Sequence, residues 1–169
     1  MKIYWWTGCL GLVLVLTGCG TGGSMVRTSG ASQPGVNPQL QAFSGLGEVS
    51  QTEKGIQVVL SGDSLFKIGR SHLSQDGLQK ADAIASVLTK YPGDLVAIME
   101  YTDNSGSDTK NLRISQRRAD SIKRELVKQS VPSDNVTAVG NGDTNPVAPN
   151  DTPDNRARNR RVVIEITTS

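Results

Sequence analysis

The chain has 169 residues, with 18 Lys and Arg against 16 Asp and Glu, one histidine, two cysteines and 4% aromatic residues. This length suits one ordinary domain plus a leader or tail, and the small net charge gives no strong field for nucleic acid. The scarcity of aromatic rings argues against a platform on which bases stack. Both cysteines, Cys9 and Cys19, precede residue 20, so a zinc site or a cysteine nucleophile in the rest of the chain is excluded.

Residues 1–18 are predicted to form a signal peptide, with Lys2 as its charged start. The apolar run CLGLVLVL at 9–16 is shorter than the ~20 apolar residues of a membrane-spanning helix. The sequence Leu-Thr-Gly before Cys19 resembles the bacterial lipobox, in which the cysteine becomes the first mature residue and carries acyl chains such as palmitate. We therefore expect Cys19 to be a lipid anchor. The open alternatives are an ordinary secreted protein and a short uncleaved anchor.

Gly20 follows the expected anchor. Bacterial lipoproteins that stay at the inner membrane typically have Asp at this position, so by this resemblance we expect the cell outer membrane, with the domain facing the periplasm. Residues 19–45 are predicted to be the lipidated cysteine and a flexible linker, because Gly, Ser, Thr, Gln and Pro give the segment no apolar period. The alternative is that Leu40, Phe43 and Leu46 form a short amphipathic segment that docks on a partner.

Residues 46–169 are predicted to form one domain in which strands and helices alternate. The hydrophobic pattern predicts, in chain order, a hairpin of strands at 48–51 and 56–60, a helix at 74–90, a strand at 95–99 covered on both faces, a helix from about 109 to 126, a strand at 136–139, a helical turn around Arg156 and a strand at 162–166. Ser74 is the expected N-cap of the first long helix. The apolar face of the second is Leu112, Ser115, Ala119, Ile122 and Leu126. This order indicates an α/β chain of the α+β two-layer kind, with helices on one face of the sheet.

The residues best suited to a binding site follow the strand at 95–99. Thr102 and Asp103 come at the end of that strand. Asn111, Ser115 and Arg118 are spaced four and three apart, so they share one helix face, and that face can be directed toward Asp103. A carboxylate and a guanidinium that converge on one loop suit a zwitterion. The carboxylate accepts hydrogen bonds from an ammonium, and the guanidinium donates two parallel hydrogen bonds to a carboxylate. The basic run at 156–161 offers further guanidinium donors.

As a set, these motifs resemble the OmpA-like C-terminal domain, a family that includes peptidoglycan-associated lipoproteins and flagellar stator proteins. The likeness covers roughly residues 55–167. The matching residues are Thr102-Asp103, Gly106, Asn111, Ile114-Ser115, Arg118-Ala119, Gly140-Asn-Gly142, Pro146, Asn150-Asp-Thr152, Arg156-Ala157 and Asn159-Arg160-Arg161-Val162. The resemblance implies a βαβαβ(α)β sandwich with a mixed sheet.

The resemblance also implies non-covalent binding of peptidoglycan through the diaminopimelate of its stem peptide. Carried over, Asp103 holds the diaminopimelate ammonium and Arg118 its carboxylate. Thr102 and Asn111 shape the loop or donate hydrogen bonds. Supporting contacts come from Arg160 or Arg161. No enzymatic activity, cofactor, metal or nucleic-acid partner is expected.

The chain departs from the family at Glu100 and Tyr101, where Gly-His is common. Tyr101 can still donate one hydrogen bond, whereas Glu100 adds a negative charge that competes for Arg118 or for the ammonium. Asn155 replaces a usual glycine and can take the same left-handed conformation.

Simpler interpretations stay open for each candidate. Asp103 alone suits a turn or helix cap, and Arg118 suits a weak surface pair with Glu125 or Asp120. The run at 156–161 suits a solvated face. At the level of function, the first hypothesis is a tether between outer membrane and cell wall. The second is a signalling or assembly lipoprotein whose wall-binding domain serves a periplasmic protein partner, with residues 36–50 as the region that discriminates the two.

Overall fold

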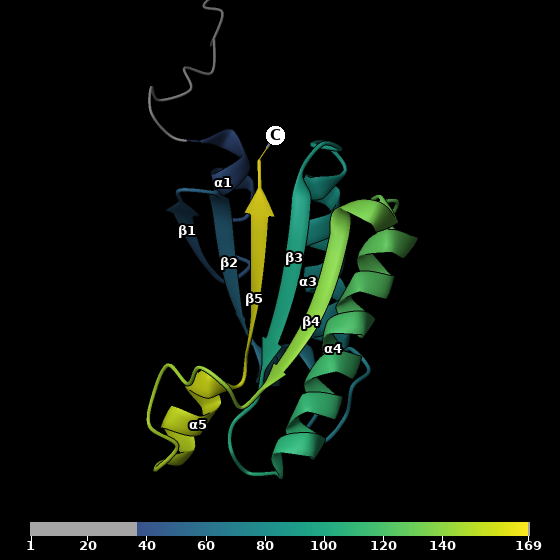
Figure 1. The fold of residues 1–169 in the computed structure, drawn as a ribbon. Coiled ribbons are helices and arrows are strands. Elements are labelled where there is room, and N and C mark those ends of the chain that lie inside the picture. The colour runs from purple at the N-terminus through teal and green to yellow at the C-terminus, as the bar shows by residue number, and fades with distance from the viewer. Residues whose placement is uncertain (1–36, 169) are drawn as a thin grey trace, which may run out of the picture. The chain divides into compact units, whose positions relative to one another are not determined.

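The computed structural model describes residues 37–168, which form a five-stranded sheet with two long helices packed on one of its faces (Figure 1). The strands are β1 (Glu48–Thr52), β2 (Gly55–Ser61), β3 (Leu95–Tyr101), β4 (Val136–Gly142) and β5 (Arg161–Thr167). The helices are α1 (Pro38–Ala42), α2 (Gly62–Leu65), α3 (Gln75–Leu88), α4 (Asp108–Lys128) and α5 (Pro153–Asn159), with a 3-10 turn at Ser133–Asn135.

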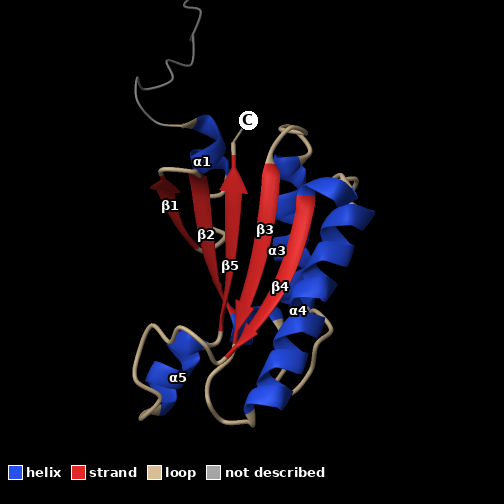
Figure 2. Ribbon diagram, viewed as in Figure 1, coloured by secondary structure: helices blue, strands red, loops and turns tan. Residues whose placement is uncertain are grey.

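The sheet is mixed, with the strand order β1-β2-β5-β3-β4. β5 lies between β2 and β3 and is antiparallel to both, while β3 and β4 are parallel neighbours. Helices α3 and α4 lie behind and beside the sheet, and α5 lies at its lower end (Figure 2). The predicted class, α+β with a mixed sheet and helices on one face, is confirmed.

Alternation along the strands builds the core. Every second residue of β2, β3 and β5 points at the helices, and the apolar ones among them are at most 2% exposed: Ile56, Val58, Leu60, Val96, Ile98, Val162, Ile164 and Ile166. They form one cluster with Ile84 and Leu88 of α3 and Ile122 and Leu126 of α4. Burying each such side chain contributes roughly 1.5–3 kcal/mol, so this interface is the main source of stability.

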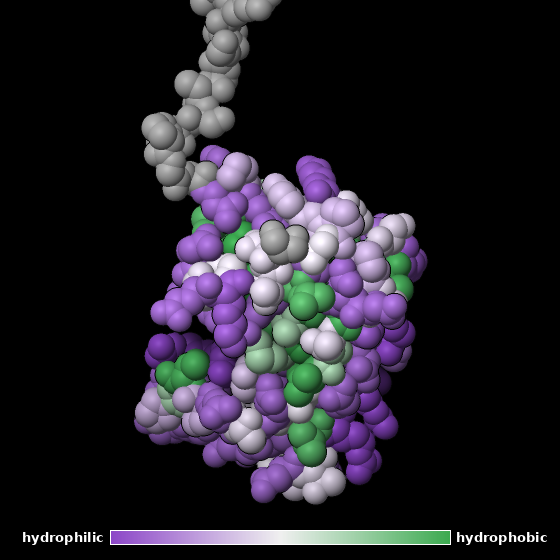
Figure 3. All heavy atoms as spheres, turned by 45° about the horizontal axis from the view of Figure 1, so that its top comes forward, coloured by the Kyte–Doolittle hydropathy of each residue, from purple (hydrophilic) through white to green (hydrophobic). Residues whose placement is uncertain are grey.

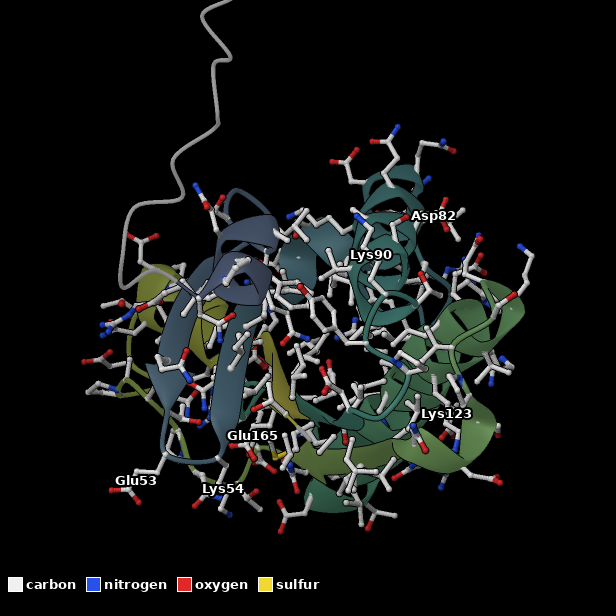
Figure 4. All side chains as sticks on the ribbon, turned by 90° about the horizontal axis from the view of Figure 1, so that it is seen from above. Glu53, Lys54, Asp82, Lys90, Lys123 and Glu165 are labelled. Carbon is white, nitrogen blue, oxygen red and sulfur yellow. The ribbon has the colours of Figure 1, made fainter. Side chains whose placement is uncertain are left out.

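The outer edge of β4 is closed by side chains of α4. Gln116 donates from Nε2 to the Ala138 carbonyl at 3.2 Å and accepts from the Gly140 amide at 2.9 Å. Lys123, labelled in Figure 4, donates to the Val136 carbonyl at 2.5 Å. A side chain at Gly140 would stand 2.0 Å from the Gln116 amide, so only glycine allows α4 this close. Peptide groups that would otherwise pair with another chain are thereby satisfied.

The opposite face of the sheet is not covered by α3 or α4. Leu95 is 56% exposed and Val139 is 46% exposed. Figure 3 shows a stripe of hydrophobic side chains, with smaller hydrophobic groups apart from it, within a mostly hydrophilic surface. Glu165 points away from α3 in Figure 4. The prediction that strand 95–99 is covered on both faces is therefore wrong, because the helices pack on one side only.

The predicted flexible linker at 19–45 differs from the structure at its C-terminal end. Phe43 is fully buried in the core, and Leu40 and Leu46 pack against the same cluster. Gln39 of α1 donates to Asp94 Oδ2 at 2.5 Å. The ordered domain thus begins by residue 37. The three apolar side chains dock on the domain's own core rather than on a partner.

Composition does not indicate this docking, because Leu40, Phe43 and Leu46 are too few to set an apolar period at the end of a segment rich in Gly, Ser and Pro. The predicted signal peptide, the expected anchor Cys19 and the rest of the linker lie outside the described residues. None of the helices between residues 37 and 168 has the length and apolar character needed to cross a membrane.

The predicted apolar face of α4 is also corrected at its start. Leu112 is 55% exposed, whereas Asn111 is 6% exposed. The first turn of α4 lies beside the polar loop after β3 rather than against the apolar core, and there Asn111 donates to the Asp103 carbonyl at 3.2 Å.

We predict that Phe43→Ala lowers the free energy of unfolding by about 4 kcal/mol, because it removes a fully buried ring and leaves a cavity. Urea denaturation followed by circular dichroism measures this. The control is Ile68→Ala, whose side chain is 97% exposed and which should change stability by about 0.5 kcal/mol or less. Equal effects for the two variants would show that residues 37–45 are not part of the folded domain.

Candidate functional site

A groove of about 1180 Å³ opens between the α2–α3 segment, the loop after β3 and the first half of α4. Its lining includes Asp63, Phe66, Arg70, Thr102, Asp103, Asn111, Arg118 and Arg160. The predicted site residues Thr102, Asp103, Asn111, Arg118 and Arg160 therefore meet at one groove. Asp63 of α2 and Phe66 and Arg70 after it also line this groove, and the sequence did not indicate them.

Arg160 holds two carboxylates at one end of the groove. Its Nη1 donates to Asp103 Oδ2 at 2.6 Å, and its Nε and Nη2 donate to Asp63 at 2.7 and 2.6 Å. The paired bonds to Asp63 match the planar fork of a guanidinium to a carboxylate. The hydrogen bonds that Arg160 donates to Asp63 and Asp103 outweigh partial burial and raise the pKa of Arg160, so it stays charged.

Asp103 is fixed from both of its oxygens. Oδ1 accepts from the Ser105 amide at 2.9 Å, which closes a tight turn after β3. Partial burial opposes ionisation of Asp103, but the hydrogen bonds from Arg160 and Ser105 outweigh it and lower the pKa. The groove therefore presents a permanent carboxylate at neutral pH.

Arg118 lies at the floor of the groove and is 6% exposed. Its Nη1 donates to Glu100 Oε1 at 3.1 Å and its Nε to the Arg70 carbonyl at 2.9 Å. The guanidinium carbon lies 4.9 Å from the centre of the Phe66 ring, a cation–π contact. The alternatives in which Arg118 pairs with Glu125 or Asp120 are wrong. The expected competition by Glu100 is present as a direct ion pair.

Glu100 faces the helix layer because it follows Ile98 in the alternation of β3, and it is fully buried. Burial raises its pKa to about 7, against the lowering effect of Arg118. Oε2 makes no hydrogen bond within residues 37–168. A buried carboxylate with one free oxygen is costly, because the ion loses its water without full replacement.

Thr102 is the second residue here with an unused polar atom. It is 8% exposed, and its hydroxyl has no hydrogen-bond partner among the described residues. Its amide donates to the Gly142 carbonyl at 2.7 Å, which fixes the residue at the wall of the groove. Buried hydroxyls are normally paired, so an unpaired one in a groove indicates a place for a ligand group.

The two arginines expected to support the site are separated by the sheet. Arg160 donates to Asp103 and Asp63 in the groove and also borders a second groove of about 740 Å³ on the other side. Arg161 lines only that second groove. There its guanidinium carbon stacks 3.9 Å from the centre of the Tyr101 ring, and it donates to the Asn145 carbonyl at 3.0 Å. Consecutive residues at a strand start point to opposite faces, so only one of the pair can reach the groove.

Asn159 is a residue whose structural role the sequence did not reveal. It is fully buried, accepts from the amides of Val147 and Ala148 at 2.9 and 3.0 Å, and donates to the Ala148 carbonyl at 2.8 Å. It also donates to Asn150 Oδ1 at 2.9 Å, which in turn accepts from the Asn104 amide at 3.4 Å. These bonds join the loop before α5 to the loop that carries Asp103.

The groove offers charged groups of both signs and a hydroxyl that can form hydrogen bonds. Within residues 37–168, no group of three or more His, Cys, Asp and Glu side chains is placed to hold a metal ion. The arrangement suits recognition of a small charged or zwitterionic group by one carboxylate, one guanidinium and one hydroxyl.

Comparison with known proteins places the chain in a family. The sequence profile of the OmpA family matches residues 65–160, which include Thr102, Asp103, Asn111, Arg118 and Arg160 of the groove. The chain belongs to the OmpA family.

Curated relatives are similar over the same region. The chain is 36% identical over 121 residues to "Probable lipoprotein YiaD" of Escherichia coli, covering 66% of this chain and 55% of that protein. It is 34% identical over 120 residues to "Peptidoglycan-binding protein ArfA" of Mycobacterium tuberculosis, covering 71% of this chain and 37% of that one. The chain thus spans from about a third to about half of these relatives.

A solved structure shares the fold. The cell wall anchor of the type VI secretion system (T6SS) from Pseudomonas aeruginosa superposes with a TM-score of 0.64 and 29% identity, covering 72% of this chain and 88% of that one.

We predict that Glu100→Gln changes the pH dependence of stability. The pKa of Glu100 is raised in the folded state, so the protein loses stability as the pH rises from about 4.5 to about 7. The free energy of unfolding of Glu100→Gln minus that of wild type should therefore depend on pH. This difference should be about 3 kcal/mol larger at pH 8 than at pH 4. Urea denaturation at both pH values measures the difference.

The matched control is Glu53→Gln, an exposed glutamate at the β1–β2 turn (Figure 4), which should show no such change between the two pH values. A difference between wild type and Glu100→Gln that is independent of pH would contradict the burial of an ionisable carboxylate at this position.

Proposed function

We propose that this protein is an outer-membrane lipoprotein that binds peptidoglycan non-covalently through the diaminopimelate side chain and so tethers membrane to cell wall. The observation that carries the proposal is that Asp103 and Arg118 line one groove. The end of the diaminopimelate side chain bears an ammonium and a carboxylate, and the groove offers the opposite charge to each.

The roles follow from the unused capacity of each side chain. Asp103 accepts two hydrogen bonds, and a carboxylate has about four acceptor positions, so an ammonium can be added. Arg118 uses two of its five N–H donors on Glu100 and Arg70. Thr102 contributes its unpaired hydroxyl, and Asn111 holds the loop by its bond to Asp103.

Arg160 acts as a support in this proposal. Its bonds to Asp63 and Asp103 leave Asp103 ionised and fixed in direction. Arg161 has no part in the proposed site, because it lies on the other face of the sheet.

The membrane half of the proposal rests on Cys19 and on the relatives. The lipobox-like sequence before Cys19 supports acylation, and Gly20 supports the outer membrane. One similar protein is named a lipoprotein and another peptidoglycan-binding. Acyl chains on Cys19 would hold the protein in the membrane, since several chains together hold firmly.

The second candidate is a lipoprotein that serves a periplasmic partner or a secretion machine. The likeness to the T6SS cell wall anchor favours it. Deleting residues 36–50 cannot discriminate the two functions, because Phe43 belongs to the core. The discriminating deletion is therefore 20–36, tested for loss of partner capture with wall binding retained.

We predict that Asp103→Asn and Arg118→Ala each weaken binding to purified sacculi by about 10-fold or more, since each removes a charge-assisted hydrogen bond. Co-sedimentation with sacculi over a range of protein concentrations measures the affinity. Arg124→Ala removes the same charge from the same helix outside the groove and should bind as wild type does.

Arg118→Ala also leaves Glu100 buried without its partner, so the double variant Glu100→Gln/Arg118→Met separates loss of binding from loss of folding. Wild-type affinity in a folded double variant would remove Arg118 from the proposed site.

We predict that Cys19→Ser abolishes labelling by a palmitate analogue in bacterial cells and moves the protein from the membrane fraction to the soluble fraction. Cys9→Ser is the control, because Cys9 lies within the predicted signal peptide and should not affect labelling. Continued labelling of the Cys19 variant would disprove the anchor assignment.

A further inference from the structure

The guanidinium of Arg118 already has a carboxylate of the protein as its partner. Glu100 occupies Nη1 at 3.1 Å, and both side chains are withdrawn from solvent, with exposed side-chain fractions of 8% and 0%. The other fixed contacts of Arg118, to the Arg70 carbonyl and the Phe66 ring, are uncharged. The charge that faces the groove from this position is therefore largely cancelled when Glu100 is ionised.

A ligand carboxylate that binds the remaining N–H groups of Arg118 would lie within a few ångströms of Glu100. Two carboxylates that share one cation in a dry site cannot both stay ionised at low cost, and one of them takes up a proton. Oε2 of Glu100 makes no hydrogen bond within residues 37–168, so a proton can be added there without breaking a bond.

We propose that Glu100 sets the ligand specificity of the groove: a carboxylate binds at Arg118 only when Glu100 is protonated, whereas a carboxamide binds there in either protonation state of Glu100. This inference rests on the proposed function and deepens it. The groove would thus distinguish stem peptides whose diaminopimelate side chain ends in a free acid from those in which it is amidated.

Besides Arg118, charged side chains from several elements line the groove. The charged groups of the groove are Asp63 of α2, Lys67 and Arg70 of the α2–α3 loop, Asp76 of α3, Asp103 after β3 and Arg160 before β5. Of these, Asp63, Asp103 and Arg160 form one hydrogen-bonded network, and Asp103 has a lowered pKa. Glu100 is the buried carboxyl group of the site whose pKa lies near neutrality, at about 7.

His72 lies exposed in the same α2–α3 loop and is the single histidine of the chain. Histidine is the side-chain type that ordinarily titrates between pH 5 and 8, so its contribution must be separated by experiment. His72→Gln is therefore the matched control for Glu100→Gln.

The test is isothermal titration calorimetry of the full-length protein in detergent. The probes are the tripeptide L-Ala-γ-D-Glu-meso-diaminopimelate and the same peptide with a carboxamide at the side-chain end. Each is measured at pH 6 and pH 8, in two buffers with different ionisation enthalpies, so that proton uptake is counted directly.

For wild type, the affinity for the acid peptide should fall about 10-fold from pH 6 to pH 8, because a group with a pKa near 7 changes from mostly protonated to mostly ionised. Proton uptake on binding should approach one at pH 8. The amide peptide should bind with equal affinity at both pH values and without proton uptake. His72→Gln should behave as wild type.

In Glu100→Gln, the pH dependence should disappear and the acid peptide should bind more tightly than the amide. Binding of the acid peptide to wild type that is equal at both pH values, or pH dependence that persists in Glu100→Gln and vanishes in His72→Gln, would overturn this inference while leaving the proposed function intact. Failure of both peptides to bind any form would overturn the two together.

Discussion

The buried ion pair between Glu100 and Arg118 joins the central strand β3 to the helix α4 at the point where the core ends and the groove begins. Burying two charges costs several kcal/mol per ion, and the pair offsets this only through mutual attraction and further hydrogen bonds. Arg118 is supported by the Arg70 carbonyl and the Phe66 ring, so it also fixes the α2–α3 segment. Three elements of the groove thus depend on one guanidinium.

A second guanidinium completes the framework from the other side. Arg160 reaches Asp63, 97 residues earlier, and Asp103, 57 residues earlier, and so connects β5 to α2 and to the end of β3. Asn159, its neighbour, satisfies four hydrogen-bonding groups with its two polar atoms and keeps the adjacent loop in place. The groove is therefore built by polar contacts between segments that are distant in sequence, whereas the apolar core below it supplies the stability.

Behind Thr102, Asp103, Asn111 and Arg118, which line this groove, the chain places one further charge. Glu100 contributes a fully buried carboxylate that pairs with Arg118, so the two charges largely cancel when Glu100 is ionised. The two ends of the groove therefore respond differently to pH. Hydrogen bonds hold the Asp103 carboxyl ionised, whereas burial away from water raises the pKa of the Glu100 carboxyl beside Arg118.

The sequence by itself determined the order of the strands and of helices α3, α4 and α5, because apolar periodicity and caps such as Ser74 are local signals. It did not indicate the short helices α1 and α2. It also identified Asp103, Asn111 and Arg118 as a group, since helix spacing and one strand end suffice to bring them together. The boundary near residue 37 and the exposure of Leu112 escaped it, because burial there depends on which surface the segment meets.

Only the tertiary structure decided which arginine enters the groove and what its partners are. Arg160 and Arg161 are the same residue type and adjacent in sequence, but where α5 ends and β5 begins the first reaches Asp103 and the second stacks on Tyr101. The sequence suggested Glu100 as a competitor for Arg118. Packing decided that Glu100 is buried, forms an ion pair with Arg118 and has a pKa of about 7. Desolvation is a property of the assembled core, so no local pattern of residues can specify it.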